Sequence, residues 1–141
     1  MRVFTAAAGI ALLGAAANAA WSYQPVVNFQ VNCMGCHLAD GSGQAGRVPS
    51  IRRSLVLFSS TREGRNYIVR VPGVAQSPLS DADTAALLNW MARNLSDLNL
   101  PPDFADYSEA EVQGLRHRPL VKVSDVRAHL MKAAAGKPLR P

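Results

Sequence analysis

Apolar residues recur at helical spacing along much of the chain, most clearly after Ser80. Asp81 and Asp83 fall in what would be the first helical turn, where acidic side chains interact favourably with the helix dipole, and serine is a common N-cap. The apolar face consists of Ala82, Ala85, Ala86, Leu87, Leu88, Trp90 and Met91, and the pattern fades near Asn94. We therefore predict an amphipathic helix that Ser80 caps and that ends near Asn94.

Two shorter helices are expected earlier in the chain. Pro25 suits a start position and predicts a short helix just ahead of the two cysteines. Ser60 or Thr61 can cap a second helix that continues through Val69. Residues 71–79 contain two prolines and have no periodicity, so no element is predicted there.

The last third of the chain predicts two further short helices. Ser108 and Glu111 have the spacing of a capping box, so one helix should run to about Arg116. Ser124 should begin another helix, which ends near Ala135. Its apolar face would contain Val126, Leu130 and Met131. Helices this short are not stable alone, so we expect them to pack on the preceding residues or on a partner. The chain lacks strand-rich halves, and the expected fold class is all-α.

The first 19 residues have a different character. Arg2 precedes an uncharged stretch rich in Ala, Leu and Gly, and Ala17-Asn18-Ala19 has the form of a signal-peptidase site. The apolar run is short for a committed membrane span. Residues 1–19 are therefore expected to be a secretory signal peptide, cleaved between Ala19 and Ala20, and an uncleaved anchor is the alternative. The mature protein would be periplasmic and would meet the membrane only through export or a partner.

The charge of the chain limits its partners. Lys and Arg total 15 against 10 Asp and Glu, a net charge of +5, and loss of Arg2 with the signal peptide lowers it by one to +4. There is no long Lys/Arg run and no nucleic-acid motif, so nucleic-acid binding is not expected. Such a mild positive charge suits docking to an acidic protein surface better.

Both cysteines of the chain lie in one pentapeptide, Cys33-Met34-Gly35-Cys36-His37. This is the attachment sequence of a c-type haem, in which each Cys can form a thioether to a haem vinyl group and the His can bind the iron. Because Cys33 and Cys36 would be one helical turn apart, both sulfurs could face the same porphyrin edge. We therefore expect one covalent haem c, with its iron bound by His37. Only 6% of the residues are aromatic, and a porphyrin could supply the large apolar body that the core lacks.

Other uses of the two cysteines are less well supported. A structural zinc site of four cysteines is impossible with two in the chain. A thiol oxidoreductase would need a βαβ context and an activating helix N-terminus, which this strand-poor chain does not suggest.

The order of motifs resembles that of class I c-type cytochromes. The pentapeptide is followed by a glycine-rich loop, by Val48-Pro49 and later by the helix that contains Trp90. The resemblance implies a cytochrome c-like helical haem domain over residues 20–96, with residues 97–141 as a C-terminal extension of short helices. It also implies that the Pro49 carbonyl accepts a hydrogen bond from the His37 ring, which would orient the ring. Trp90 would pack where the first and last helices of the domain cross.

The chain departs from this family at the sixth iron ligand. Electron-transferring members usually carry a Met shortly before the final helix, whereas residues 71–79 contain no Met, His or Lys. Val74 occupies roughly that place. The weaker candidates are Met34, Met91, Met131, His117, His129, Gln76 and Asn66. The sixth ligand therefore stays unassigned, and a five-coordinate iron or a ligand lent by a partner stays open.

These features predict a periplasmic single-electron carrier with one covalently bound haem. It would not be an enzyme itself but the partner or small subunit of a larger oxidoreductase, such as a periplasmic dehydrogenase or oxidase. The missing loop Met supports an alternative of another class, an open-site haem protein for gas binding, sensing or peroxidatic chemistry. No convincing distal His/Arg pair supports peroxidase chemistry.

Overall fold

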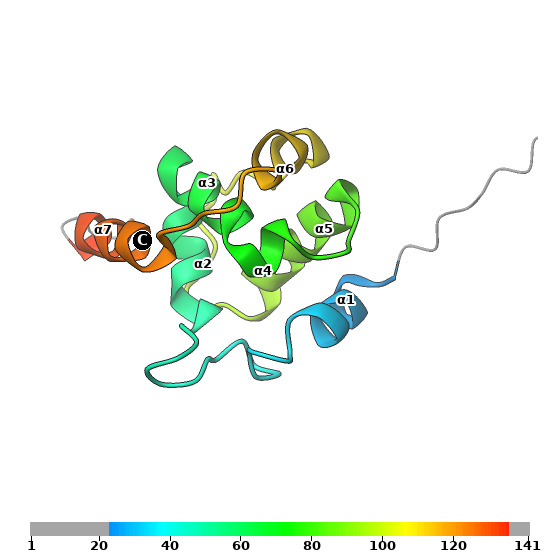
Figure 1. Ribbon diagram of the computed structural model, residues 1–141, viewed down its shortest axis with the longest axis horizontal. Coiled ribbons are helices and arrows are strands. Elements are labelled where there is room, and N and C mark those ends of the chain that lie inside the picture. The colour runs from blue at the N-terminus through cyan, green and yellow to red at the C-terminus, as the bar shows by residue number, and fades with distance from the viewer. Residues whose placement is uncertain (1–22, 136–141) are drawn as a thin grey trace, which may run out of the picture.

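The computed structural model describes residues 23–135, and this range contains seven helices and no strand (Figure 1). The helices are α1 (Pro25–Asn32), α2 (Ile51–Ser59), α3 (Arg62–Arg70), α4 (Pro72–Ala75), α5 (Asp81–Asn94), α6 (Glu109–Arg116) and α7 (Val123–Ala135). The predicted all-α fold class is confirmed. The expected signal peptide, residues 1–19 with its cleavage site at Ala19/Ala20, lies outside the described residues.

Three of the predicted helix starts are confirmed by their caps, whereas α7 begins at Val123, one residue before the predicted start at Ser124. The hydroxyls of Thr61, Ser80 and Ser108 each accept a hydrogen bond from the backbone N–H three residues later, at 3.0, 3.0 and 3.2 Å. These bonds satisfy N–H groups that have no partner within the helix. Pro25 is the first residue of α1, where its missing N–H costs nothing.

Two helices were not predicted. α2 begins after Ser50, whose hydroxyl accepts from the N–H of Arg52 at 3.3 Å, and it follows directly on a loop. α4 is a single turn that Pro72 starts. Neither has the long run of periodic residues that marks α5, so local patterns alone do not reveal them.

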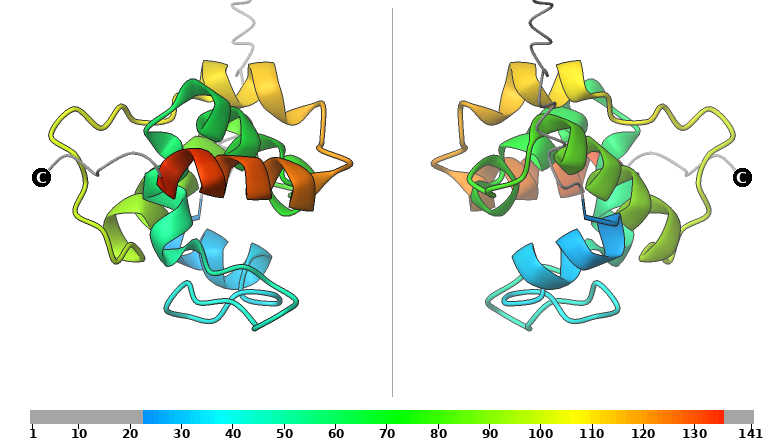
Figure 2. Two further views of the ribbon diagram at one scale, coloured as in Figure 1. Left: turned by 90° about the vertical axis from the view of Figure 1, so that its left-hand side faces the viewer. Right: turned by 90° about the vertical axis from the view of Figure 1, so that its right-hand side faces the viewer.

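Helices α2 to α7 form one body, and α1 with the segment of residues 33–50 lies at one end of it in both views of Figure 2. α2 packs on α3, α5 packs on α6, and α1 is attached to the body through α5. The rings of Phe29 and Trp90 meet at this contact, with centroids 5.8 Å apart. This is the packing that the resemblance implies for Trp90.

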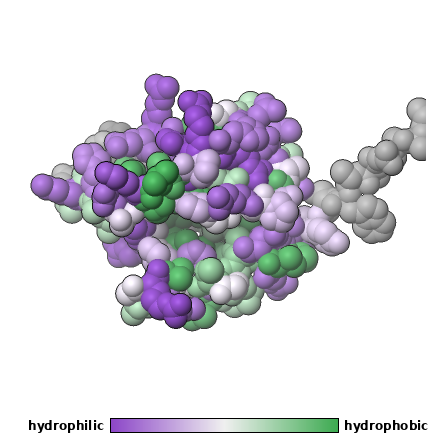
Figure 3. Space-filling view, viewed as in Figure 1, coloured by the Kyte–Doolittle hydropathy of each residue, from purple (hydrophilic) through white to green (hydrophobic). Residues whose placement is uncertain are grey.

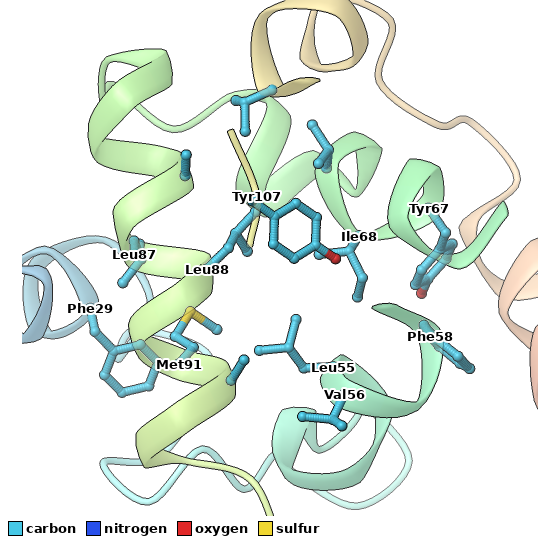
Figure 4. Close-up of a cluster of buried hydrophobic side chains, with 14 of the residues drawn as sticks. Phe29, Leu55, Val56, Phe58, Tyr67, Ile68, Leu87, Leu88, Met91 and Tyr107 are labelled. Atoms are coloured by element: carbon cyan, nitrogen blue, oxygen red, sulfur yellow. The ribbon is translucent and has the colours of Figure 1, made fainter. Parts of the chain in front are cut away.

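A single hydrophobic core joins these helices (Figure 4). Its largest fully buried apolar side chains are Phe29, Phe58, Val69, Leu88 and Val112. Residues beyond 96 contribute Tyr107, Val112 and Leu130 to the same core. Residues 97–135 therefore pack on the preceding helices and bury part of the same apolar surface.

A side-chain network fixes this C-terminal region to the body. The Arg65 guanidinium donates to both carboxylate oxygens of Glu111, at 2.7 and 2.6 Å, and stacks on the ring of Tyr107. The Tyr107 hydroxyl is bonded in turn to that of Ser59 at 2.7 Å.

One detail of the predicted C-terminal face is wrong. Leu130 is 5% exposed, but Met131 is 43% exposed. Adjacent residues on a helix point about 100° apart, so the two cannot share the narrow buried face of α7. None of the helices within residues 23–135 combines the length and the apolar run needed to cross a membrane.

Candidate functional site

The pentapeptide follows directly on the C-terminal end of α1. The N–H of Cys33 donates to the carbonyl of Phe29 at 2.9 Å, which closes the last turn of the helix. The N–H groups of Cys36 and His37 then both donate to the Cys33 carbonyl, at 3.1 and 2.9 Å. One turn of chain therefore carries both thiols and the imidazole.

The two cysteines are free thiols in different surroundings. Cys33 is half-buried and packs against the core, whereas Cys36 is exposed. Burial, and secondarily the neighbouring Cys36, raises the pKa of the Cys33 thiol to about 11. Cys33 is therefore a neutral thiol at neutral pH.

This setting argues against the thiol oxidoreductase hypothesis. Reactive cysteines of that class have lowered pKa values, typically at a helix N-terminus. Here the thiols lie at the C-terminal end of α1, where the helix dipole disfavours a thiolate. In addition, no strand occurs in the described range, so the βαβ context is missing there.

His37 is half-buried and holds one ring nitrogen inside the protein. Its Nδ1 is buried and has no hydrogen-bond partner. Burial lowers the pKa of the imidazole below its usual 6.5, so the neutral ring predominates at pH 7. A neutral imidazole is the form that binds metals.

The hydrogen bond from His37 to Pro49 that the resemblance implies is not formed in this structure. Pro49 lies against Gly43 of the same loop instead, and its carbonyl carbon is 2.8 Å from the position that a Cβ on Gly43 would take. The role of Pro49 stays a prediction.

The loop after the pentapeptide folds tightly because of its glycines. Gln44 and Val48 exchange two backbone hydrogen bonds, at 2.9 and 2.8 Å, and these bonds close a narrow turn in the loop. Gly46, within this turn, has a φ of +73°, and a Cβ on Gly43 would lie 1.9 Å from the Val48 carbonyl oxygen. A side chain at Gly43 would force this turn open.

Arg52 ties the start of this loop to the end of α5. Its guanidinium donates to Asp97 at 3.0 Å and to Asp40 at 2.8 Å. Hydrogen bonds from Ser42, and then those from Arg52, hold the pKa of Asp40 below its usual value. Arg52 does the same for Asp97. The loop is therefore fixed at its base by charge-assisted hydrogen bonds.

Two clefts open beside the pentapeptide and its loop. The first, of about 470 Å³, is lined by residues 42–50. The second, of about 310 Å³, lies between Asn32, the neighbour of Cys33, and residues 72–78. Figure 3 shows this face of the molecule hollowed between α4 and the segment of residues 38–50. Both clefts fall within the size range of small-molecule sites.

The candidates for a sixth iron ligand are spread over the molecule. Met91 is 6% exposed and points into the core, where Figure 4 shows it beside Phe29. His129 and Met131 are on α7, at the opposite side of the body from α1 in Figure 1, and the His129 Nε2 lies 3.7 Å from a carboxylate oxygen of Glu63. His117 is exposed.

The remaining candidates divide between the cleft and other contacts. Met34 is 38% exposed within the pentapeptide, and Asn66 accepts a hydrogen bond from Arg70 at 3.0 Å. Of all seven candidates only Gln76 lines the second cleft.

Sequence reasoning missed Arg116, which is buried and bonded to the segment beside the second cleft. It is followed by two exposed residues in the sequence Arg116-His117-Arg118, which suggests a solvated end of a helix. The available signal was its spacing. Arg116 follows the buried Val112 by four residues, so both lie on the same face of α6.

Comparisons of the chain with protein families, with curated proteins and with solved structures found no match. Within residues 23–135, no three His, Cys, Asp or Glu side chains come together to hold a metal ion. A haem asks less of the chain, because the porphyrin supplies most of the ligands of its iron.

Proposed function

We propose that this chain is an exported c-type cytochrome that carries single electrons between partner proteins. Cys33 and Cys36 would hold one haem through thioethers, and His37 would bind its iron. The observation that carries the proposal is the single turn that joins both thiols to the imidazole, through the two hydrogen bonds accepted by the Cys33 carbonyl.

The residues present fit a covalently bound haem. The thiols are free, and the cleft beside Asn32 begins at the residue before Cys33. The Nδ1 of His37 is buried without a hydrogen-bond partner. Burying an unpaired polar atom costs free energy, unless a bound group reorganises the site. The neutral imidazole offers a lone pair for a metal.

When bound, the haem supplies the one-electron couple of its iron. The chain contributes the tether, the ligand and the surroundings. α1 is fixed to the body by the contact between Phe29 and Trp90, so the turn of the pentapeptide starts from a rigid support. Arg52 holds the base of the following loop. These contacts would keep His37 in one orientation through a redox cycle.

The surface next to the pentapeptide supports a protein partner. Val31 and Leu38 are 75% and 53% exposed, one on each side of the motif. Apolar side chains gathered at one place on a surface mark interaction sites. A partner oxidoreductase that docks here would approach the tethered edge of the haem. Two features support export to the periplasm. One is the expected signal peptide, and the other is the haem motif, because haem attachment of this kind occurs outside the cytoplasm.

A redox titration of the purified protein tests the proposal. Wild-type protein and the Met34→Ala variant, which changes the motif but no proposed contact, should titrate in a single one-electron step followed by visible absorption. The double variant Cys33→Ala, Cys36→Ala cannot form thioethers, so it should lose its haem during purification under denaturing conditions and should then show no redox step. A wild-type protein without any visible absorption band refutes the proposal.

The composition of the second cleft favours one other function, that of an open-site haem protein. Its lining contains no Met, His or Lys and consists of Asn32, Pro72, Gly73, Gln76, Ser77 and Pro78. Carbon monoxide separates the two functions. Rapid binding to the reduced protein, with no low-spin bands beforehand, indicates the open site, whereas slow or absent binding indicates a six-coordinate carrier.

A further inference from the structure

The segment beside the second cleft is hydrogen-bonded to the C-terminal region through Arg116. We call residues 72–78 the lip, since five of them, Pro72, Gly73, Gln76, Ser77 and Pro78, form one wall of that cleft. The lip consists of the four-residue helix α4 and a short connection to α5. α4 contributes no fully buried residue, and a helix this short has little stability of its own. Contacts from elsewhere must therefore set the position of the lip.

Arg116, the last residue of α6, supplies these contacts at the C-terminal end of the lip. Its side chain is 7% exposed. One terminal nitrogen donates to the Ser77 carbonyl at 2.7 Å and its hydroxyl at 3.3 Å. The other donates to the Leu79 carbonyl at 2.7 Å, to Asp81 at 3.0 Å and to the Thr84 hydroxyl at 3.2 Å. One guanidinium thus joins the lip to the first turn of α5.

Two further hydrogen bonds fix Arg70, two residues before the lip. The N–H of Leu120 donates to the carbonyl of Arg70 at 2.9 Å, and the Arg70 Nε donates to the carbonyl of Arg118 at 2.5 Å. Figure 1 shows the connection from α6 to α7 running past α3 and α4. Residues 116–120 therefore contact the lip at Ser77 and the chain just before the lip at Arg70.

The buried charge of Arg116 makes this attachment specific. Removing a guanidinium from water is unfavourable, and it is compensated only where several acceptors meet the group in good geometry. The acceptors here are fixed by the positions of Ser77, Leu79 and Asp81. A shifted lip would leave the buried guanidinium without these partners. The arrangement accordingly favours one width of the cleft.

We propose that Arg116 is a positioning residue that fixes the lip beside the proposed haem site and so sets the width of the second cleft for small external iron ligands. The proposal rests on the second function proposed above, that of an open-site haem protein. It adds that this access depends on the C-terminal region. The ligand class is a small molecule with one donor atom, and carbon monoxide is the probe for the reduced protein.

Two substitutions and a matched control test this proposal. Arg116→Ala removes the attachment, and Arg116→Lys keeps the charge but cannot reach both ends of the acceptor set. Arg118→Ala is the control, because Arg118 is exposed and takes part in these contacts through its carbonyl alone. Hydrogen exchange is measured on the full chain at the amides of Val74, Ala75 and Gln76, which donate to the carbonyls of Val71 and Pro72 in the turn of α4.

We expect these three amides to exchange about tenfold faster or more in Arg116→Ala, because local opening becomes easier, while amides of α2 stay protected. Arg116→Lys should give a smaller increase, and it serves as the test if Arg116→Ala does not fold. Arg118→Ala should exchange like the wild type. Equal exchange in the Arg116 and Arg118 variants overturns the proposal, and so does faster exchange spread evenly over all helices.

The rate of carbon monoxide binding then tests the link to the haem site. It should change by about threefold or more in the Arg116 variants and stay unchanged in Arg118→Ala, because only the former alter the width of the cleft. A mobile lip with an unchanged rate also overturns the proposal. A protein without haem refutes the proposed function instead, and the exchange result still decides whether Arg116 holds the lip.

Discussion

The backbone N–H of His37 donates to the carbonyl of Cys33 at 2.9 Å, so the proposed iron ligand and the first proposed tether belong to one turn of chain. This turn grows out of the C-terminal end of α1, which Phe29 and Trp90 fix to α5. The proposed haem site is therefore attached to the body of the protein through one helix contact.

The first prediction concerns His37 itself. In His37→Ala the protein should still attach haem through its thiols, but the visible spectrum should change because the proximal nitrogen is gone. His117→Ala is the matched control, since His117 is exposed and lies directly after the last residue of α6. An unchanged spectrum in His37→Ala contradicts the assignment of the iron ligand.

The second prediction concerns the reactivity of the thiols in protein prepared without haem. Cys36 is exposed, whereas burial raises the pKa of Cys33 to about 11. Because only the thiolate is alkylated, iodoacetamide at pH 7.5 to 8 (a range about 3 units below that pKa) should label Cys36 first. Labelling of Cys33 should accelerate as the pH approaches its pKa. Peptide mass mapping measures both. If Cys33 reacts first at neutral pH, the thiol oxidoreductase hypothesis regains support.

The helices were more predictable from the sequence than the site. Thr61, Ser80 and Ser108 cap their helices through groups three residues away, so the signal is local and readable. The position of Arg116 is not local. Its partners Asp81 and Ser77 lie 35 and 39 residues earlier in the chain, and nothing near residue 116 specifies them.

The site itself was predictable only in part, for a related reason. The pentapeptide is a contiguous motif, and its turn follows from consecutive backbone hydrogen bonds. The second cleft instead needs Asn32 and residues 72–78 to meet, which depends on how α1 and α4 are placed by the core. Met91 was predictable, because the sequence pattern already placed it on the apolar face of α5, and the structure confirms that it belongs to the core.

The third prediction concerns alkaline stability. Burial raises the pKa of Tyr107 from its usual 10.0 to about 12, so the folded state keeps a proton that the unfolded state releases between these values. The free energy of unfolding should therefore fall as the pH rises from 10 to 12. Tyr107→Phe has no such proton and should show a shallower decline, measured by urea unfolding. The same slope in both proteins contradicts the prediction.

The fourth prediction concerns the narrow turn of the loop. A Cβ at Gly43 would lie 1.9 Å from the Val48 carbonyl oxygen, so Gly43→Ala must open the turn between Gln44 and Val48. We expect a loss of about 1–3 kcal/mol in the free energy of unfolding, as for other overpacked sites. Gly35→Ala is the control, because nothing lies within 4 Å of its added carbon. Equal losses in the two variants would show that the loop tolerates a side chain at Gly43.

The mass of the peptide that contains Cys33 and Cys36 tests the central claim most directly. Protein exported by a host that attaches c-type haem is denatured, digested and analysed by mass spectrometry. The account predicts one haem covalently bound to this peptide through both sulfurs, with the bond surviving denaturation. The same peptide recovered with two free thiols, or with a disulfide between Cys33 and Cys36, would contradict it.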